Sequence, residues 1–169
     1  MSIFSFFKNE NESDVKKYSA LHEKLQKEYP SMEEKELVIT SCVAGLLARV
    51  AYVDFELDPG EMEQIKETLK NWSISSLVHS DLIAVMAIDH IKEMAGLENH
   101  LYVHPLKEHL NSDDRFKLLK ALFILAASDG EVASVESEEI RTITKGLELS
   151  NQHFLAARAE VATFLKALK

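Results

Sequence analysis

The chain has 169 residues, with 28 acidic and 19 basic side chains and a net charge of −9. This length suits one domain whose core is stable without disulfides or a structural metal. The charge excludes nucleic acid as a ligand, because phosphate binding requires clustered Lys and Arg side chains, and it favours cations and other proteins as partners.

The N-terminal segment, residues 1–12, reads MSIFSFFKNENE and is apolar only over its first seven positions. It has no positively charged region before the apolar residues, so it is not a secretion signal. We expect it to be flexible or to contact a partner, and the alternative is a peripheral membrane contact through Ile3, Phe4, Phe6 and Phe7. The helical domain then begins near residue 13.

Helix start signals follow along the chain. Ser31-Met-Glu-Glu and Asp58-Pro-Gly-Glu are capping boxes, in which a Ser or Asp oxygen and a Glu carboxylate satisfy backbone N–H groups. Ser112-Asp-Asp and Ser150-Asn-Gln mark further starts, while Gly96 and Gly146 mark ends. These signals predict helices over 13–28, 32–53, 59–71, 76–95, 104–110, 113–128, 135–146 and 151–167. Strand patterns are scarce, so we expect an all-α, single-domain bundle of about seven or eight helices.

Two of the predicted helices are apolar nearly all round, over residues 37–53 and 118–127. A helix without a polar face belongs at the centre of a bundle. Their sequences contain no run of about 18 apolar residues, so no transmembrane segment is expected. The first contains the single cysteine, Cys42, which we expect to be a buried thiol in a cytoplasmic protein. The expected core residues are Leu46, Leu47, Val50, Leu122, Ile124 and Leu125.

Each apolar helix is followed by the same pattern. The segments LLARVAYVDFELDPGEMEQI and ALFILAASDGEVASVESEEI align without a gap at an offset of 75 residues. The alignment pairs Asp54 with Asp129 and Glu56 with Glu131. The chain is therefore predicted to be built from a duplicated helix, acidic loop and helix unit.

The two loop regions, residues 54–63 and 129–139, hold 10 of the 28 acids and no basic residue. Acids in the first turn of a helix are stabilised by the helix dipole, and an aspartate before the helix caps it. This explanation covers Asp58, Glu61, Glu63, Glu136, Glu138 and Glu139. It does not cover Asp54, Glu56, Asp129 and Glu131, which follow the C-terminal end of a helix, where the dipole disfavours anions.

The spacing D-x-E-x₆-E occurs in both copies and favours a site for a hard divalent cation, Ca²⁺, Mg²⁺ or Mn²⁺, which takes oxygen ligands from loops. No other cofactor is expected. The loops are not EF-hands, because Pro59 replaces the turn glycine and Ile65 replaces the closing glutamate. The predicted ligands are Asp54, Glu56 and Glu63 in the first copy and Asp129, Glu131 and Glu138 in the second.

Five of the seven histidines lie between residues 79 and 109. His100 and His104 would share a helix face as metal ligands, with Asp89 or Glu108 assisting, or the histidines are scattered polar residues without a site. Arg49, inside the first apolar helix, either reaches solvent or pairs with an acid of either loop. No nucleophilic triad or phosphate-binding glycine loop is present, so we do not expect an enzyme.

The sequence resembles the TerB-like domains of bacterial tellurite-resistance and stress proteins, also found at the front of a DnaJ-like co-chaperone. The resemblance rests on AASDGEV followed by Glu138 and Ile140, and on the matching first copy; it covers roughly residues 35–165, within a helical domain of 13–169. It implies an all-helical, non-enzymatic fold whose acidic loops bind metal and whose relatives act in membrane-associated stress complexes. The implied metal ligands are Asp129, Glu131 and Glu138. The first copy departs from the motif, since Phe55 replaces its glycine.

Two functional hypotheses follow. In the first, the acidic loops bind a divalent cation. In the second, the domain is a scaffold without metal, whose acidic face docks a basic protein and whose N-terminal segment touches a membrane or another subunit.

Overall fold

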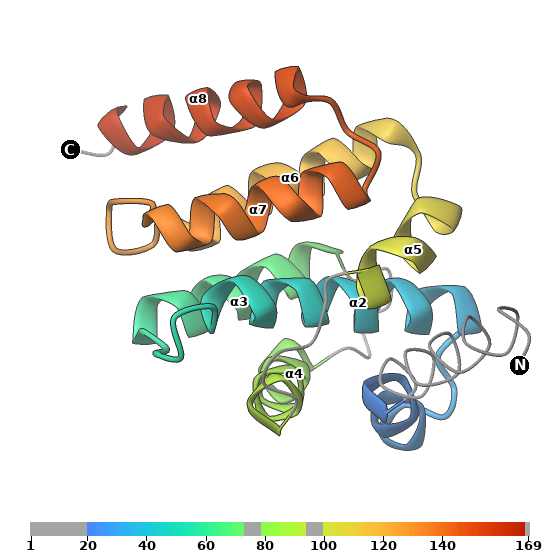
Figure 1. Ribbon diagram of the computed structural model, residues 1–169. Helices are drawn as coiled ribbons and strands as arrows, with labels where there is room; N and C mark the ends of the chain where they lie inside the picture. Colours follow the sequence, from blue (N-terminus) through green and yellow to red (C-terminus); the bar gives the residue numbers. More distant parts are fainter. Residues whose placement is uncertain (1–19, 73–78, 94–99, 168–169) are drawn as a thin grey trace, which may run out of the picture.

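The structure is a computed structural model and describes residues 20–72, 79–93 and 100–167. Within this part of the chain the elements are helices joined by short turns, and no strand is present. The expected all-α fold is therefore confirmed. Residues 20–28 are helical, and the following helices (Figure 1) are α2 (Glu34–Ala51), α3 (Pro59–Trp72), α4 (Ser80–Glu93), α5 (His100–His109), α6 (Ser112–Ala126), α7 (Ser134–Gly146) and α8 (Asn151–Ala167).

The predicted cap of α2 at Ser31 was wrong. Helix α2 begins at Glu34 and its N-cap residue Glu33 makes no side-chain capping bond. Ser31 instead lies in a turn, where the N–H of Met32 donates to the carbonyl oxygen of Tyr29 at 3.1 Å. Helix α6 begins at Ser112, next to the predicted start at 113, and its cap is Asn111, whose side-chain oxygen accepts the N–H of Asp114 at 2.8 Å. The predicted stop at Gly96 lies outside the described residues.

Helix α5 begins at His100, four residues before the predicted start at 104, and ends at His109. Pro105 therefore lies in the helix interior rather than in the first turn, and proline there removes one backbone hydrogen bond. Packing compensates for that loss: Tyr102 and Leu106 are buried, and the ring of Tyr102 lies directly on Gly45 of α2. A Cβ atom at Gly45 would lie 2.7 Å from Cδ1 of that ring, so α5 approaches α2 more closely than any other residue there would allow.

The predicted end of helix α7 at Gly146 is confirmed. The left-handed residue after the helix is Glu148, with φ 56°, and not the glycine. A Cβ atom at Gly146 would lie 2.9 Å from Cγ2 of Val103. This glycine therefore permits the close contact of α7 with α5.

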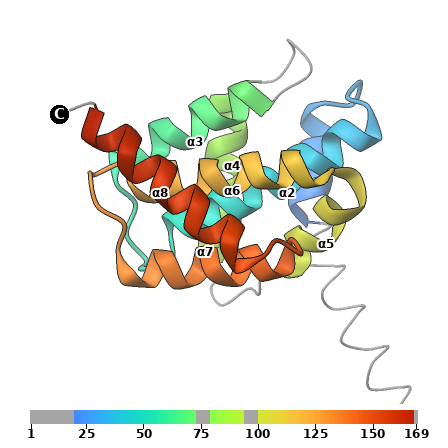
Figure 2. The same ribbon diagram turned by 90° about the horizontal axis from the view of Figure 1, so that it is seen from above.

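The apolar helices α2 and α6 pack against each other at the centre, as predicted. The duplication is visible in space: α3 and α4 pack on α2, while α7 and α8 pack on α6 (Figures 1 and 2). The halves also interlock, since α3 contacts α6 and α7 contacts α2. Helix α5 lies between the two repeats in sequence and contacts α2 and α7.

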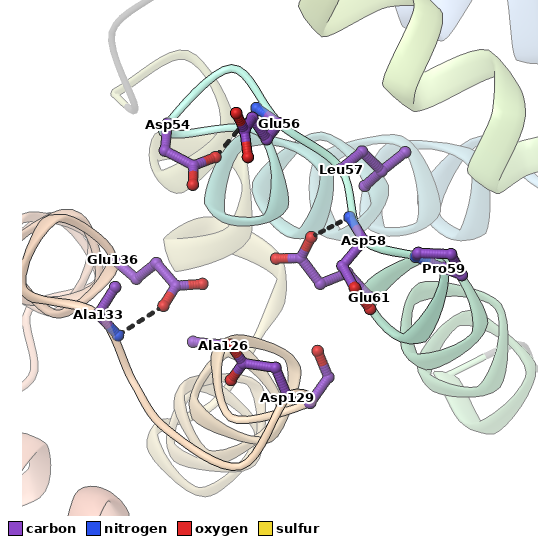
Figure 3. Close-up of a pocket in the computed structure, with 11 residues that line it drawn as sticks. Asp54, Glu56, Leu57, Asp58, Pro59, Glu61, Ala126, Asp129, Ala133 and Glu136 are labelled. Carbon is purple, nitrogen blue, oxygen red and sulfur yellow. Dashed lines mark hydrogen bonds between the residues drawn. The ribbon is translucent and has the colours of Figure 1, made fainter.

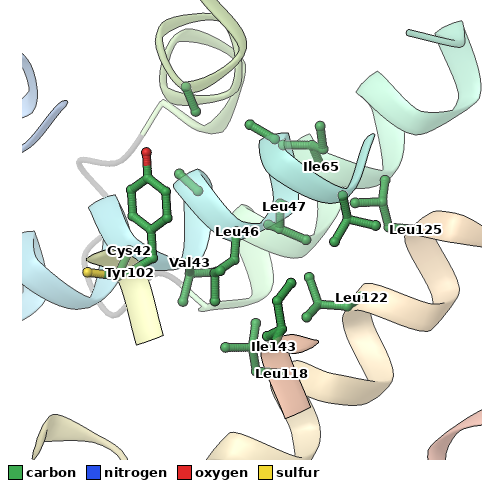
Figure 4. Close-up of a cluster of buried hydrophobic side chains, with 14 of the residues drawn as sticks. Cys42, Val43, Leu46, Leu47, Ile65, Tyr102, Leu118, Leu122, Leu125 and Ile143 are labelled. Carbon is green, nitrogen blue, oxygen red and sulfur yellow. The ribbon is translucent and has the colours of Figure 1, made fainter. Parts of the chain in front are cut away.

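The core lies around this central pair (Figure 4). Five of the six expected core residues are fully buried, and so is the free thiol of Cys42. The exception is Ile124, which is only partly buried, at the edge of α6 beside α8. No helix in the described part of the chain is long and apolar enough to cross a membrane.

Candidate functional site

The two loops, residues 52–58 and 127–133, adopt the same turn. In the first loop Asp54 Oδ1 accepts the N–H of Glu56 at 3.0 Å, and in the second Asp129 Oδ1 accepts the N–H of Glu131 at 3.0 Å. The residue between has a left-handed backbone in both, at Phe55 (φ 67°) and Gly130 (φ 101°). The sequence repeat is therefore also a structural repeat.

The following helices also begin alike. Glu61 Oε2 accepts the N–H of Asp58 at 2.7 Å, and Glu136 Oε2 accepts the N–H of Ala133 at 2.8 Å. In the first copy Asp58 Oδ1 also accepts the N–H of Gly60 at 2.6 Å, which completes the predicted capping box. In the second copy Ala133 has no side-chain oxygen, so only the glutamate half of the box forms.

Helices α2 and α6 end on the same side of the molecule, which brings the two loops together (Figures 1 and 2). Between them lies a cavity of about 330 Å³, which we call the acidic cavity (Figure 3). Carboxylates of both loops and both following helices face this space. Its acidic lining residues are Asp54, Glu56, Asp58, Glu61, Asp129 and Glu136.

The electrostatics of the acidic cavity couple the two loops. The pKa of Glu61 is raised to about 7, mainly by burial. Its backbone hydrogen bond to Asp58 lowers the pKa, and the carboxylates of Glu136, Asp54 and Asp58 raise it. Burial also raises the pKa of Glu136, with added contributions from Asp129 and Asp54. Among the described residues, no Lys or Arg lines the cavity to neutralise this charge.

The structure separates the six predicted ligands. Asp54, Glu56 and Asp129 line the acidic cavity. Glu131 lies in another groove, beside α8. The remaining two are on outer helix surfaces: Glu63 Oε1 lies 2.6 Å from Lys66 Nζ, and Glu138 Oε1 lies 3.4 Å from Arg141 Nε.

Three cavity residues were missed as candidates, namely Asp58, Glu61 and Glu136. The sequence explained all three by helix capping and the helix dipole, and the hydrogen bonds above confirm that Asp58 and both glutamates do serve as caps. The second carboxylate oxygen of each glutamate makes no backbone bond of this kind. The offset of 75 aligns Glu61 with Glu136, but it also aligns Glu63 with Glu138, so the sequence repeat alone does not select the pair that lines the cavity.

The donor atoms suit a hard divalent cation, since the acidic lining supplies only carboxylate oxygens. In the described part of the chain, however, no three Asp, Glu, His or Cys side chains converge closely enough to hold an ion as they stand. A bound cation would require carboxylates of the cavity to rotate toward one point. Glu56, which is exposed, has the freedom to do so, whereas Asp58 Oδ1 is held by the N–H of Gly60.

A family model described as tellurite resistance protein TerB matches residues 40–159, which is 120 of the 169 residues. The chain belongs to the TerB family. The match begins within α2, ends within α8 and includes both loops of the acidic cavity. Comparison with curated proteins and with solved structures finds no match.

In this TerB-family chain, Arg49 pairs with an acid from the second repeat, one of the two predicted alternatives. Its Nε donates to Glu139 Oε1 at 2.7 Å, and the side chains are 22% and 13% exposed. Neither residue lines the acidic cavity. The pair joins α2 to α7 and has a structural role.

The histidines of this TerB-family chain form no metal cluster within the described residues. His104 is exposed, with Nε2 3.5 Å from Glu108 Oε1. The side chain of His100 lies outside the described part of the chain, so the predicted pairing with His104 stays a prediction. His90 is buried in α4, and its Nε2 has no hydrogen-bond partner.

Proposed function

We propose that this chain is a non-enzymatic, cytoplasmic stress-response domain of the TerB family whose acidic cavity binds a divalent cation, Ca²⁺, Mg²⁺ or Mn²⁺. The observation that carries the proposal is that six carboxylates, from the two loops and the helices that follow them, line one cavity that no Lys or Arg of the described residues lines. Carboxylates that face one cavity raise one another's pKa unless a cation neutralises their charge.

In this proposal both loops contribute to the same site. Asp54 and Asp129 would supply oxygens from the ends of α2 and α6, and Glu61 and Glu136 would supply them from the first turns of α3 and α7. The cation would offset the repulsion between these groups and hold the two halves of the bundle together at this end. Glu63, Glu131 and Glu138 have no part in this site, because they lie outside the acidic cavity.

The test is a thermal melt with and without each cation after treatment with a chelator. A cation at 100 times its dissociation constant raises the unfolding free energy by about 2.7 kcal/mol. The double variant Glu61→Gln/Glu136→Gln keeps both helix caps and should lose this shift. The matched control, Glu63→Gln/Glu138→Gln, removes the same charge outside the cavity and should keep it.

The alternative is a scaffold in which a basic protein segment neutralises the same cavity. The observation that favours it is the exposure of Glu56 and Asp58 at the cavity, where a Lys or Arg side chain of a partner has access. The family resemblance suggests a membrane-associated complex as the setting. In that case none of the cations shifts the melt of the native chain, and a lysine-rich peptide binds in the presence of chelator.

A further inference from the structure

Phe55, in the first loop, combines a strained backbone conformation with an exposed aromatic side chain. Its φ of 67° is left-handed, a conformation that is costly for a bulky residue and that glycine adopts freely at the equivalent position 130. Its side chain is 67% exposed and makes an edge-to-face contact with Tyr52, with ring centroids 5.9 Å apart. Backbone strain of this kind persists mainly where it serves a function, and for an exposed aromatic side chain we infer that this function is contact with another surface.

A surface of matching character lies between α6 and α8. It is a groove of about 370 Å³, here called the α6–α8 groove, with an apolar floor. Phe164 is 52% exposed at this floor. This volume is at the small end of the roughly 300–1,000 Å³ that pockets for single ligands occupy. The lining residues are Ala121, Ile124, Val161 and Phe164, with Lys117, Lys120 and Glu160 at the edges.

The charges around the two features are complementary. Phe55 is flanked by the exposed acids Asp54 and Glu56, whereas two lysines border the α6–α8 groove. Lys117 pairs with Asp114 on its own helix at 2.8 Å, and Lys120 pairs with Glu160 across the groove at 3.2 Å. Surface pairs of this kind contribute little stability and can be exchanged for other acids.

We propose that Phe55 of one copy of this chain inserts into the α6–α8 groove of a second copy, with Asp54 and Glu56 facing the lysines. The inserted loop and the groove are different surfaces of the same chain, so the contact is head-to-tail. A row of associated copies therefore has a free loop at one end and a free groove at the other. A contact with one aromatic anchor is small, and small interfaces are weak and transient. The proposal does not depend on cation binding, and its test is performed in chelator.

The test measures the weight-average mass of the full chain by sedimentation as the concentration rises to about 1 mM, the range of weak contacts. The weight-average mass of the native chain should exceed the mass of one copy at high concentration. It should decrease toward that mass when the salt concentration is raised. Phe55→Gly removes the anchor and also the backbone strain, so this variant should stay folded and remain monomeric. Ala121→Glu blocks the groove with a side chain that suits a helix and should also remain monomeric.

A matched control separates the groove from general surface stickiness. Leu155→Ser removes a side chain of α8 that is 52% exposed and does not line the groove, so it should associate like the native chain. The decisive experiment mixes Phe55→Gly, whose groove is intact, with Ala121→Glu, whose loop is intact. The mixture should form pairs of two chains and nothing larger.

Three results would overturn the proposal. The first is a native chain whose mass does not depend on concentration. The second is association that survives Phe55→Gly, and the third is a mixture of the two variants that stays monomeric. A failure of cation binding leaves all of these measurements unchanged, so the two proposals are tested separately.

Discussion

The carboxyl group of Glu61 makes the stability of the chain depend on pH. Its pKa is raised from 4.5 to about 7, first by burial, so the folded chain holds this proton more tightly than the unfolded chain between these values. The free energy of unfolding should therefore fall as the pH rises through this window, in chelator. Urea unfolding at several pH values measures how the unfolding free energy changes with pH. Glu61→Gln keeps the acceptor for the N–H of Asp58 and should reduce this pH dependence. An unchanged pH dependence would show that Glu61 is not the group responsible.

His90 produces the opposite dependence. Burial lowers its pKa from 6.5, and the charge of Lys24 lowers it further against a smaller raising effect of Glu93. The unfolded chain then binds the proton more readily, so this residue stabilises the fold above pH 6.5 and the contribution is lost as the pH falls below that value. His90→Gln removes the titration and should reduce the acid sensitivity in the same urea experiment. A variant as acid-sensitive as the native chain would show that another group is responsible.

At the scale of helices, the ion pair between Arg49 and Glu139 ties the two repeats together. Its atoms are 2.7 Å apart and both side chains are mostly buried, so removing one partner leaves the other without its hydrogen bond. We expect Arg49→Met to cost about 1–3 kcal/mol of unfolding free energy. A double-mutant cycle with Glu139→Gln should give a coupling energy of about 0.5–3 kcal/mol. Additive single effects would mean that the two side chains do not interact in solution.

Local sequence signals predicted most of the helices because caps and apolar faces are properties of neighbouring residues. Asp58 and Ser150 stand at the starts of α3 and α8, as their sequences indicated. The signals failed where packing outweighs local preference. Helix α5 begins at His100, four residues before its predicted start, because the contacts of Tyr102 with α2 and of Val103 with α7 hold this turn in place.

At the scale of the whole molecule, the sequence repeat predicted two loops but not their meeting. Each copy alone suggested its own set of three metal ligands, with Glu63 as the third ligand in the first copy and Glu138 in the second. The packing of α2 on α6 instead places both loop ends around one cavity, and it turns Glu61 and Glu136 inward while Glu63 and Glu138 stay outside. This outcome depends on how two distant helices pack, which no spacing within one loop encodes.

The shared cavity leads to a prediction about stoichiometry. If the acidic cavity binds a cation, both loops supply its ligands, so titration calorimetry should give one site per chain and not two. Asp54→Asn and Asp129→Asn alter different loops of the same site, and each alone should weaken all of the binding. Two independent loop sites would behave differently, since each variant would remove half of the binding and leave the other half at its native affinity. Glu131→Gln serves as the control in the second loop, because its carboxylate lies outside the cavity.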